Sequence, residues 1–347
     1  MRIESLELFC IKMPMVGEFT TSFGTTQERE ILLVKASVGG ASGWGESGAD
    51  GVPMYSYATA RTGWHIIEDF VAPVVLEEEW PEEGFAVAYA EKFSSWRWHP
   101  MARCAVEEAL WVLEAQRGEV SLQSLYADGR SMRQRISVGI SLGIQDDFEV
   151  LADQIGASLE QGYQRIKLKI EPGRDVSVVE PVRERFGDIP LMVDANCGYR
   201  NDPDALGSLK ALDGFNLLMI EQPLAEGGDQ DLEGYEPPVL LCADESCNTL
   251  GDLEYLATRY QMVNLKLDKT GGLTEALRMA RRARDLGLEL MIGNMLGTSL
   301  AMAPAFVIGL FCRYNDLDGP LLQQKDRENG MAYDGGTVSP PRPELWG

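Results

Sequence analysis

Short apolar runs alternate with amphipathic stretches from about residue 135 onward. The stretches between the runs, such as 147–161 and 273–286, have the 3.6-residue periodicity of helices. The runs cover residues 136–141, 165–170, 190–195, 217–221, 239–244, 262–267, 288–293 and, less distinctly, 313–317. Strands that alternate with helices form parallel sheets, and eight strands in roughly 190 residues favour a closed α/β barrel over an open sheet. No glycine-rich phosphate-binding motif follows a run, which weakens a nucleotide-binding alternative.

The first third of the chain has a different pattern. Residues 2–13 and 28–38 alternate apolar and polar side chains as strands do, and the second segment leads through Gly39-Gly40 into a hairpin. The polar residues 15–27 between them predict a loop. Helical periodicity covers residues 56–79, 85–97 and 101–117.

These two patterns predict two domains. We expect an α+β domain over residues 1–125 and a barrel domain over 126–321, with residues 322–347 packing back on the first domain.

Charged residues end five consecutive runs of the predicted barrel. They are Lys167 and Lys169 on the second strand, Asp194 on the third, Glu221 on the fourth, Asp244 on the fifth and Lys266 on the sixth. In a parallel α/β barrel the carboxyl ends of the strands share one rim, which carries the active site. We therefore expect these side chains to meet.

Lys167 and Lys169 lie on the same side of their strand because side chains alternate with a period of two. Two buried ammonium groups repel each other, and burial also disfavours the charged form, so one amine could stay neutral and act as a base. The alternative for an isolated pair is the solvated face of an edge strand.

The carboxylates Asp194, Glu221 and Asp244 are hard oxygen ligands, which suit Mg²⁺ rather than zinc. Taken singly, each could instead cap the following helix. Asn196 and Glu245 are candidates for orienting these ligands or the lysines, or for loop and cap hydrogen bonds. The second and sixth strands face each other across a barrel, so lysines there could move a proton on opposite faces of a carbon next to a carboxylate.

Composition excludes several classes of function. The formal net charge of −23 argues against nucleic acids and anionic membranes as partners, and no apolar run is long enough to span a bilayer. The six cysteines have no paired spacing and predict reduced thiols in a cytoplasmic protein. The two histidines, His65 and His99, precede the barrel, so its acid and base are not histidines.

Several motifs resemble those of the enolase superfamily, muconate-lactonising subgroup. They are Lys167-Leu168-Lys169, Asp194-Ala195-Asn196, Glu221-Gln222-Pro223, Ala243-Asp244-Glu245-Ser246 and residues 264–272. The resemblance implies a modified (β/α)7β barrel with an N-terminal α+β capping domain. It also implies Mg²⁺ on Asp194, Glu221 and Asp244, acid/base roles for Lys169 and Lys266, and a role for Lys167 in lowering the pKa of Lys169.

The subgroup contains dipeptide epimerases, N-succinylamino acid racemases, o-succinylbenzoate synthases and cycloisomerases. The segment Asp316-Leu317-Asp318 is similar to the motif with which dipeptide epimerases bind the substrate ammonium group, although alone it could form a turn before Gly-Pro. Residues 293–300, which include Met295, also resemble one group of these epimerases.

The resemblance therefore implies an isomerase, a Mg²⁺-dependent dipeptide epimerase that inverts the α-carbon of the C-terminal residue of an L,L/L,D dipeptide. The alternatives are an N-succinylamino acid racemase, an o-succinylbenzoate synthase, or a catalytically silent metal-binding barrel. Members of the family commonly form homo-oligomers, which we expect here as well.

The substrate side chain is predicted from the loop after the first strand. Relatives that epimerise Ala-Glu carry an arginine in this loop, whereas the gap-free match here is Gly24, beside Phe23. We therefore expect an apolar or cationic second residue rather than glutamate.

Overall fold

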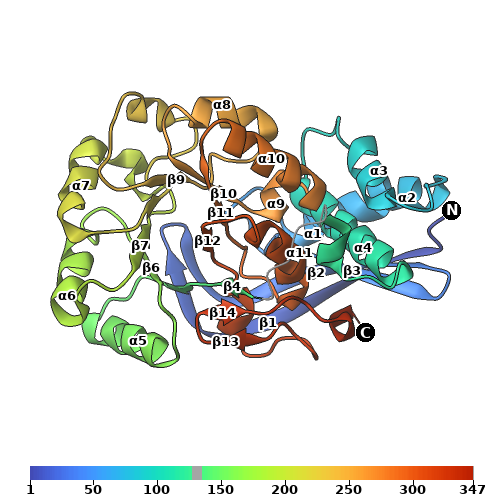
Figure 1. Ribbon diagram of the computed structural model, residues 1–347, viewed down its shortest axis with the longest axis horizontal. Coiled ribbons are helices and arrows are strands. Elements are labelled where there is room, and N and C mark those ends of the chain that lie inside the picture. Colours follow the sequence, from blue (N-terminus) through green and yellow to red (C-terminus); the bar gives the residue numbers. More distant parts are fainter. Residues whose placement is uncertain (127–134, 347) are drawn as a thin grey trace.

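The computed structural model describes residues 1–126 and 135–346, so the predicted domain boundary lies beside residues outside the described part. The chain begins with an antiparallel sheet of order β1-β2-β3, made of β1 (Ser5–Thr21), β2 (Gly24–Val38) and β3 (Ala41–Ser47). The following helices are α1 (Ala60–Ile66), a π-helical turn (Ile67–Val71), α2 (Ala72–Glu77), α3 (Phe85–Lys92) and α4 (Pro100–Arg117). This capping region lies on the right of Figure 1.

Eight parallel strands form the second part, one in each predicted run. They are β5 (Ile140–Leu142), β6 (Ile166–Lys169), β7 (Leu191–Asp194), β8 (Ile220–Glu221), β9 (Leu241–Ala243), β10 (Met262–Leu265), β11 (Glu289–Ile292) and β12 (Tyr314–Asn315). The hydrogen-bonded order runs from β12 through β11 and so on to β5. The Gly139 N–H donates to the Asn315 carbonyl at 3.1 Å, which links the first and last strands of this curled sheet. The predicted modified barrel with an α+β cap is confirmed.

Helices surround the strands on the left, at the top and next to the capping region of Figure 1. They are α5 (Phe148–Glu160), α6 (Val176–Phe186), α7 (Ala205–Ala211), α8 (Leu253–Leu256), α9 (Leu267–Thr270), α10 (Leu273–Asp285) and α11 (Ser299–Gly309). Short 3-10 helices cover Leu122–Tyr126, Gly198–Asn201, Asp213–Phe215, Asp229–Leu232, Leu250–Asp252, Gly319–Leu322 and Pro343–Trp346. None of the helices in the described residues combines the length and hydrophobicity needed to span a bilayer.

The predicted loop over residues 15–27 is wrong. β1 continues to Thr21 and returns as β2 from Gly24, with an irregular register between Pro14 and Phe19. The ladder of backbone hydrogen bonds needs no apolar alternation, which is why the side-chain pattern did not reveal it. In Figure 1 this blue hairpin reaches from the capping region to the barrel, where the Ile144 N–H donates to the Thr20 carbonyl at 2.9 Å.

A layer of sulfur-containing side chains fills the barrel interior on the amino-terminal side of the strand-end carboxylates. Met192, Met219 and Cys242 are fully buried, and each lies two residues before a strand-end carboxylate. Since side chains alternate along a strand, each points to the same side as the carboxylate that follows it. Met262 and Met291 complete this buried apolar cluster.

The capping region contacts the barrel through buried polar groups. The Glu46 carboxylate accepts hydrogen bonds from the Thr298 N–H at 2.9 Å and the Thr298 hydroxyl at 2.5 Å. The Gly48 N–H donates to Asp268 Oδ1 at 2.6 Å, and a side chain at Gly48 would collide with Asp268 and Met295. These contacts fix residues 46–48 against the rim of the barrel.

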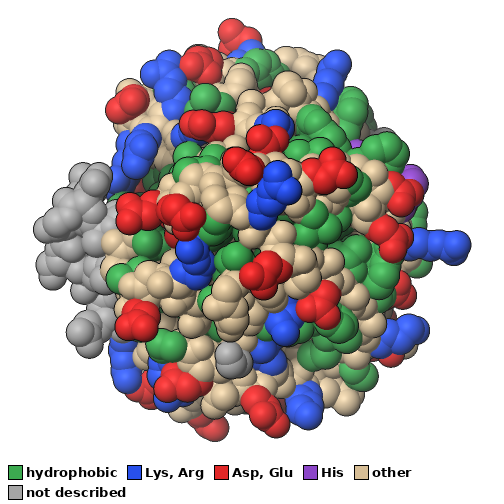
Figure 2. Space-filling view, turned by 90° about the vertical axis from the view of Figure 1, so that its right-hand side faces the viewer, with side chains coloured by type: hydrophobic (Ala, Val, Ile, Leu, Met, Phe, Trp, Pro, Cys, Tyr) green, Lys and Arg blue, Asp and Glu red, His purple; other side chains and the backbone are tan. Residues whose placement is uncertain are grey.

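The C-terminal residues contact both parts of the molecule. β14 (Thr337–Val338) pairs with β13 (Tyr333–Asp334) and with β4 (Ile136–Ser137), which leads into the barrel. The Gln324 N–H donates to the Pro14 carbonyl of β1 at 2.9 Å. Figure 2 shows acidic and basic side chains interspersed on the capping face, so the negative charge of the chain does not gather there into one patch.

Candidate active site

The strand ends bring the predicted charged residues together. Lys169, Asp194 and Glu221 are neighbours in the register of β6, β7 and β8, and Asp244 and Lys266 directly follow β9 and β10. Asp194, Glu221 and Asp244 are at most 1% exposed. A buried carboxylate persists only where cations or hydrogen-bond donors compensate its charge.

Lysines supply that compensation. Lys169 Nζ lies 2.5 Å from Asp194 Oδ2, and Lys266 Nζ lies 2.7 Å from Asp244 Oδ2. Lys269 lies 2.6 Å from Asp244 Oδ1, a contact that the sequence motifs did not predict. Lys169 and Lys266 also line one cavity, from strands β6 and β10.

Lys167 differs from Lys169 in its surroundings. Its Nζ lies 3.0 Å from Glu221 Oε2, 3.5 Å from Asp194 Oδ2 and 2.6 Å from Asp316 Oδ2. Burial lowers the pKa of Lys167, but the carboxylates of Asp316, Glu221 and Asp194 raise it well above its usual range. Lys167 is therefore a permanent cation in this arrangement, as its predicted influence on Lys169 requires.

The carboxyl groups of the rim crowd one another. Burial and the charge of Asp194 raise the pKa of Glu221 to about 7, and burial and the charge of Asp244 raise that of Glu245 to about 8. Asn196 donates to Glu245 Oε1 at 3.1 Å, whereas Glu245 Oε2 has no hydrogen-bond partner in the described part of the chain. The rim therefore carries more carboxylate oxygen than its donors satisfy.

The chemistry of this donor set fits a hard divalent cation. Asp194, Glu221 and Asp244 offer only oxygen, from three adjacent strands. In the conformation described for residues 1–126 and 135–346, however, no three Asp, Glu, His or Cys side chains converge as metal ligands. Lysine ammonium groups contact the carboxylate oxygens of all three residues. The lysine or carboxylate side chains must therefore rotate before the carboxylates can bind a cation.

Asp316 and Asp318 both line the cavity but have different partners. Asp316 contacts Arg165 and Lys167, and these cations lower its pKa although burial raises it. Asp318 accepts hydrogen bonds from the Ser141 N–H at 2.7 Å and the Asn294 amide at 3.2 Å. Burial and the charge of Asp316 raise the pKa of Asp318. The motif resemblance had predicted one shared role for the two aspartates, binding of the substrate ammonium group.

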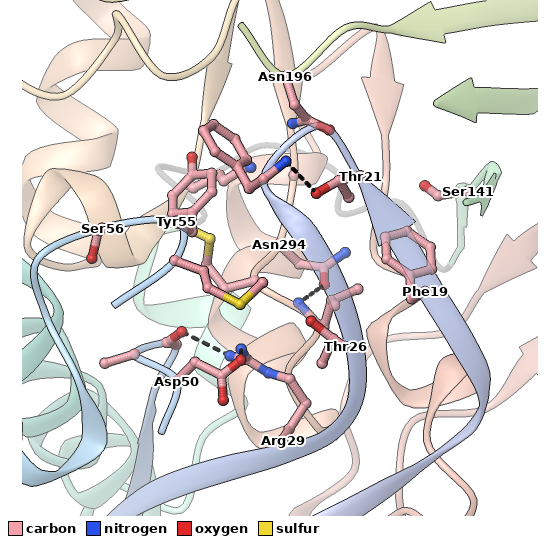
Figure 3. A pocket seen from close by; sticks show the side chains of 18 of the residues that line it. Phe19, Thr21, Thr26, Arg29, Asp50, Tyr55, Ser56, Ser141, Asn196 and Asn294 are labelled. Carbon is pink, nitrogen blue, oxygen red and sulfur yellow. Dashed lines mark hydrogen bonds and ion pairs between the residues drawn. The ribbon is translucent and has the colours of Figure 1, made fainter. Parts of the chain in front are cut away.

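The capping region supplies the opposite wall of the cavity, seen in Figure 3. Phe23, Gly24 and Met295, expected near the substrate, all line it. Lining residues that the motifs did not reveal include Phe19, Arg29, Asp50, Met54, Tyr55 and Met101. Tyr55 packs its ring 5.4 Å from that of Phe23 and 5.1 Å from Lys266 Nζ. None of these residues lies at a barrel strand end, the only location that the pattern analysis could identify.

Comparison with known proteins gives matches along nearly the whole chain. The family described as mandelate racemase / muconate lactonizing enzyme, N-terminal domain, matches residues 5–126, and the family described as enolase C-terminal domain-like matches 150–344. An o-succinylbenzoate synthase of Geobacillus stearothermophilus is 40% identical over 309 residues, 87% of this chain and 80% of that protein. An N-succinylamino acid racemase of Amycolatopsis sp is 36% identical over 317 residues, 87% of this chain and 82% of that protein.

A solved structure gives a match of similar extent. It is an enolase family member from Agrobacterium tumefaciens, described as having homology to dipeptide epimerases and as containing sodium and L-Ala-L-Glu. It is 34% identical to this chain, with a TM-score of 0.86 and 99% of each chain covered.

Proposed function

The chain belongs to the enolase superfamily, within the mandelate racemase / muconate lactonizing enzyme family, and from this we propose that it is a Mg²⁺-dependent dipeptide epimerase. The reaction is inversion at the α-carbon of the C-terminal residue. The observation that carries the proposal is the carboxylate of Asp318, which lines the cavity and whose hydrogen-bond donors within residues 1–126 and 135–346 are all neutral.

An ammonium group complements Asp318. No lysine or arginine in the described residues lies within 4 Å of this carboxylate, so it has no direct cationic partner there. The N-terminal amine of a dipeptide would supply the missing cation and form a charge-assisted hydrogen bond. A succinyl group would instead bring a second carboxylate to this position, and two buried anions repel each other.

The proton transfer is assigned to the two lysines that line the cavity from β6 and β10. A neutral amine at Lys169 or Lys266 would accept the α-proton, leaving the electron pair of the C–H bond on the α-carbon and its carboxylate. The ammonium group of the other lysine would donate a proton to the opposite face, which inverts the centre. Asp194, Glu221 and Asp244 would hold Mg²⁺, which when bound stabilises negative charge developing on the substrate carboxylate.

Apolar residues surround the space left for the side chain of the second substrate residue. Phe19, Phe23, Met54 and Met101 line the cavity from the capping side, and Met295 lines it from the segment after β11. The Agrobacterium relative was solved with L-Ala-L-Glu, but position 24 here is glycine, where an added side chain would collide with Met54. These contacts support an apolar second residue.

The second candidate is an N-succinylamino acid racemase or o-succinylbenzoate synthase. The names of the Geobacillus and Amycolatopsis relatives favour it. Its substrates carry no free amine, and this is the feature that separates it from the proposed function.

Exchange of the α-hydrogen in D₂O tests both candidates. We expect Mg²⁺-dependent deuterium incorporation into L-Ala-L-Leu and L-Ala-L-Phe, slower incorporation into L-Ala-L-Glu, and little into N-succinyl-L-leucine. Lys169→Met and Lys266→Met should each abolish epimerisation, whereas Lys210→Met, at an exposed lysine outside the cavity, should not. Exchange confined to the succinylated substrate would establish the second candidate. No exchange with either class would exclude the dipeptide epimerase and the succinylamino acid racemase, and a dehydration assay would then separate an o-succinylbenzoate synthase from a catalytically silent barrel.

A further inference from the structure

One ion pair lies in the apolar wall of the substrate cavity. Arg29 of β2 places Nη1 2.5 Å from Oδ2 of Asp50, and its Nη2 donates to the Gly48 carbonyl at 2.8 Å. The Arg29 side chain is 7% exposed and that of Asp50 is 21% exposed. Both residues line the cavity that contains Lys169 and Lys266, and Figure 3 shows them facing each other at the capping end.

The carboxylate of Asp50 compensates the charge of Arg29 within the pair. Among the described residues, Asp50 is the one carboxylate within 4 Å of the Arg29 guanidinium. The Asp50 Oδ1 atom accepts the Gly51 N–H at 2.6 Å and the Glu30 N–H at 3.4 Å, so its position is fixed by the backbone. Arg29 Nε is buried without a hydrogen-bond acceptor. The guanidinium thus retains donor capacity that Asp50 does not use.

We propose that Asp50 sets the charge selectivity of the side-chain end of this cavity by neutralising Arg29. With Asp50 present, its negative charge repels a substrate carboxylate from the guanidinium of Arg29. Substrates with uncharged side chains are therefore favoured. Without the Asp50 charge, Arg29 has no carboxylate within 4 Å in the described residues, although Glu46 and Asp268 still interact with it at longer range. Its guanidinium is then free to bind a substrate carboxylate through paired N–H donors. This inference rests on the proposed function, because it concerns the side chain at the reacting α-carbon.

The substitution Asp50→Asn tests the proposal by a gain of activity. Asparagine keeps the oxygen that accepts the Gly51 and Glu30 N–H groups but removes the charge. We expect the ratio of kcat/KM for L-Ala-L-Glu to that for L-Ala-L-Leu to rise at least tenfold. The double variant Asp50→Asn/Arg29→Gln should lose this rise, because the released guanidinium is then absent.

A neighbouring acid provides the matched control. Glu30 follows Arg29 on β2, does not line the cavity, and contacts the Cys10 thiol at 3.5 Å. Glu30→Gln removes one negative charge near Arg29 without releasing it, so the ratio should stay within twofold of that of the unmodified protein.

The reverse substitution keeps the proposal testable if Asp50→Asn does not fold. Arg29→Gln leaves Asp50 as an uncompensated anion and should raise the ratio of L-Ala-L-Lys to L-Ala-L-Leu at least tenfold. Unchanged ratios in the folded variants would overturn the proposal. If only N-succinylamino acids react, the proposed function fails, and the same ratio measured with N-succinyl-glutamate and N-succinyl-leucine still tests the role of Asp50.

Discussion

Arg165 Nη1 lies 2.7 Å from Asp316 Oδ1, and both side chains are buried. Lys167 contacts the second oxygen of the same carboxylate at 2.6 Å. Each oxygen of Asp316 thus has its own cationic partner. The Asp316 carboxylate also places a negative charge close to Asp318, two residues further along the chain. Of the two aspartates, Asp318 is the one able to bind a further cation.

Replacing Asp318 with asparagine should impair recognition of the substrate amine. Loss of a buried charge-assisted hydrogen bond is worth roughly 2–3 kcal/mol, so kcat/KM for L-Ala-L-Leu should fall about 30- to 150-fold, largely through KM. Steady-state kinetics check this, with Asp334→Asn on exposed β13 as the control. An equal loss with N-succinyl-leucine would contradict amine binding at Asp318.

Replacing Arg165 with methionine should destabilise the fold. The change leaves Asp316 with Lys167 alone and removes the stacking of the guanidinium on Tyr314, so we expect a loss of about 3 kcal/mol in the free energy of unfolding. Arg313, which stacks on the same ring but pairs with Glu289 at the surface, is the control. Arg313→Met should cost less than about 1 kcal/mol in urea unfolding. Similar costs for both variants would show that the buried pair contributes little.

Mg²⁺ should raise the midpoint of thermal unfolding. A ligand that binds only the folded state stabilises it by about 2.7 kcal/mol at a hundredfold excess over Kd. Glu221→Gln, which keeps the size of the side chain but removes a proposed ligand charge, should greatly reduce the shift. Differential scanning fluorimetry with and without EDTA measures it, independently of activity. A shift of equal size in the variant would exclude Glu221 as a ligand.

Stability should depend on pH through Glu107, which lies buried on α4 away from the cavity. Burial raises its pKa to about 7, although hydrogen bonds from Thr274 and Trp111 lower it. The folded state then binds the proton more tightly, so this contribution is complete below the unfolded pKa near 4.5 and is lost as the pH rises through 7.

Glu107→Gln removes this dependence because glutamine does not ionise. Relative to the unmodified protein, the variant should gain on the order of 3 kcal/mol in unfolding free energy between pH 5 and pH 8. Glu77→Gln, at an exposed position on α2, should gain nothing over the same range. Parallel pH profiles for the Glu107 variant and the unmodified protein would contradict a raised pKa.

The sequence predicted the parts of this molecule that are governed by local pattern. The eight barrel strands follow apolar runs, and the charged residues that end them meet because parallel strands share one rim. The hairpin tip at Phe23 was predicted as a loop because its pairing relies on backbone groups. The contact of Gly48 with Asp268 spans 220 positions, and no local pattern encodes such a partner. Arg165 begins a predicted strand, yet only the fold brings Asp316 to it.

The two walls of the cavity come from different segments of the chain. Residues 19–58 and Met101 form the capping wall, while the lysines and carboxylates stand on barrel strands. Under the proposed function, substitutions in the capping wall should therefore alter which compounds bind while leaving the lysines proposed to move the proton in place. Substrate preference can therefore change during evolution while the proposed proton transfer stays the same.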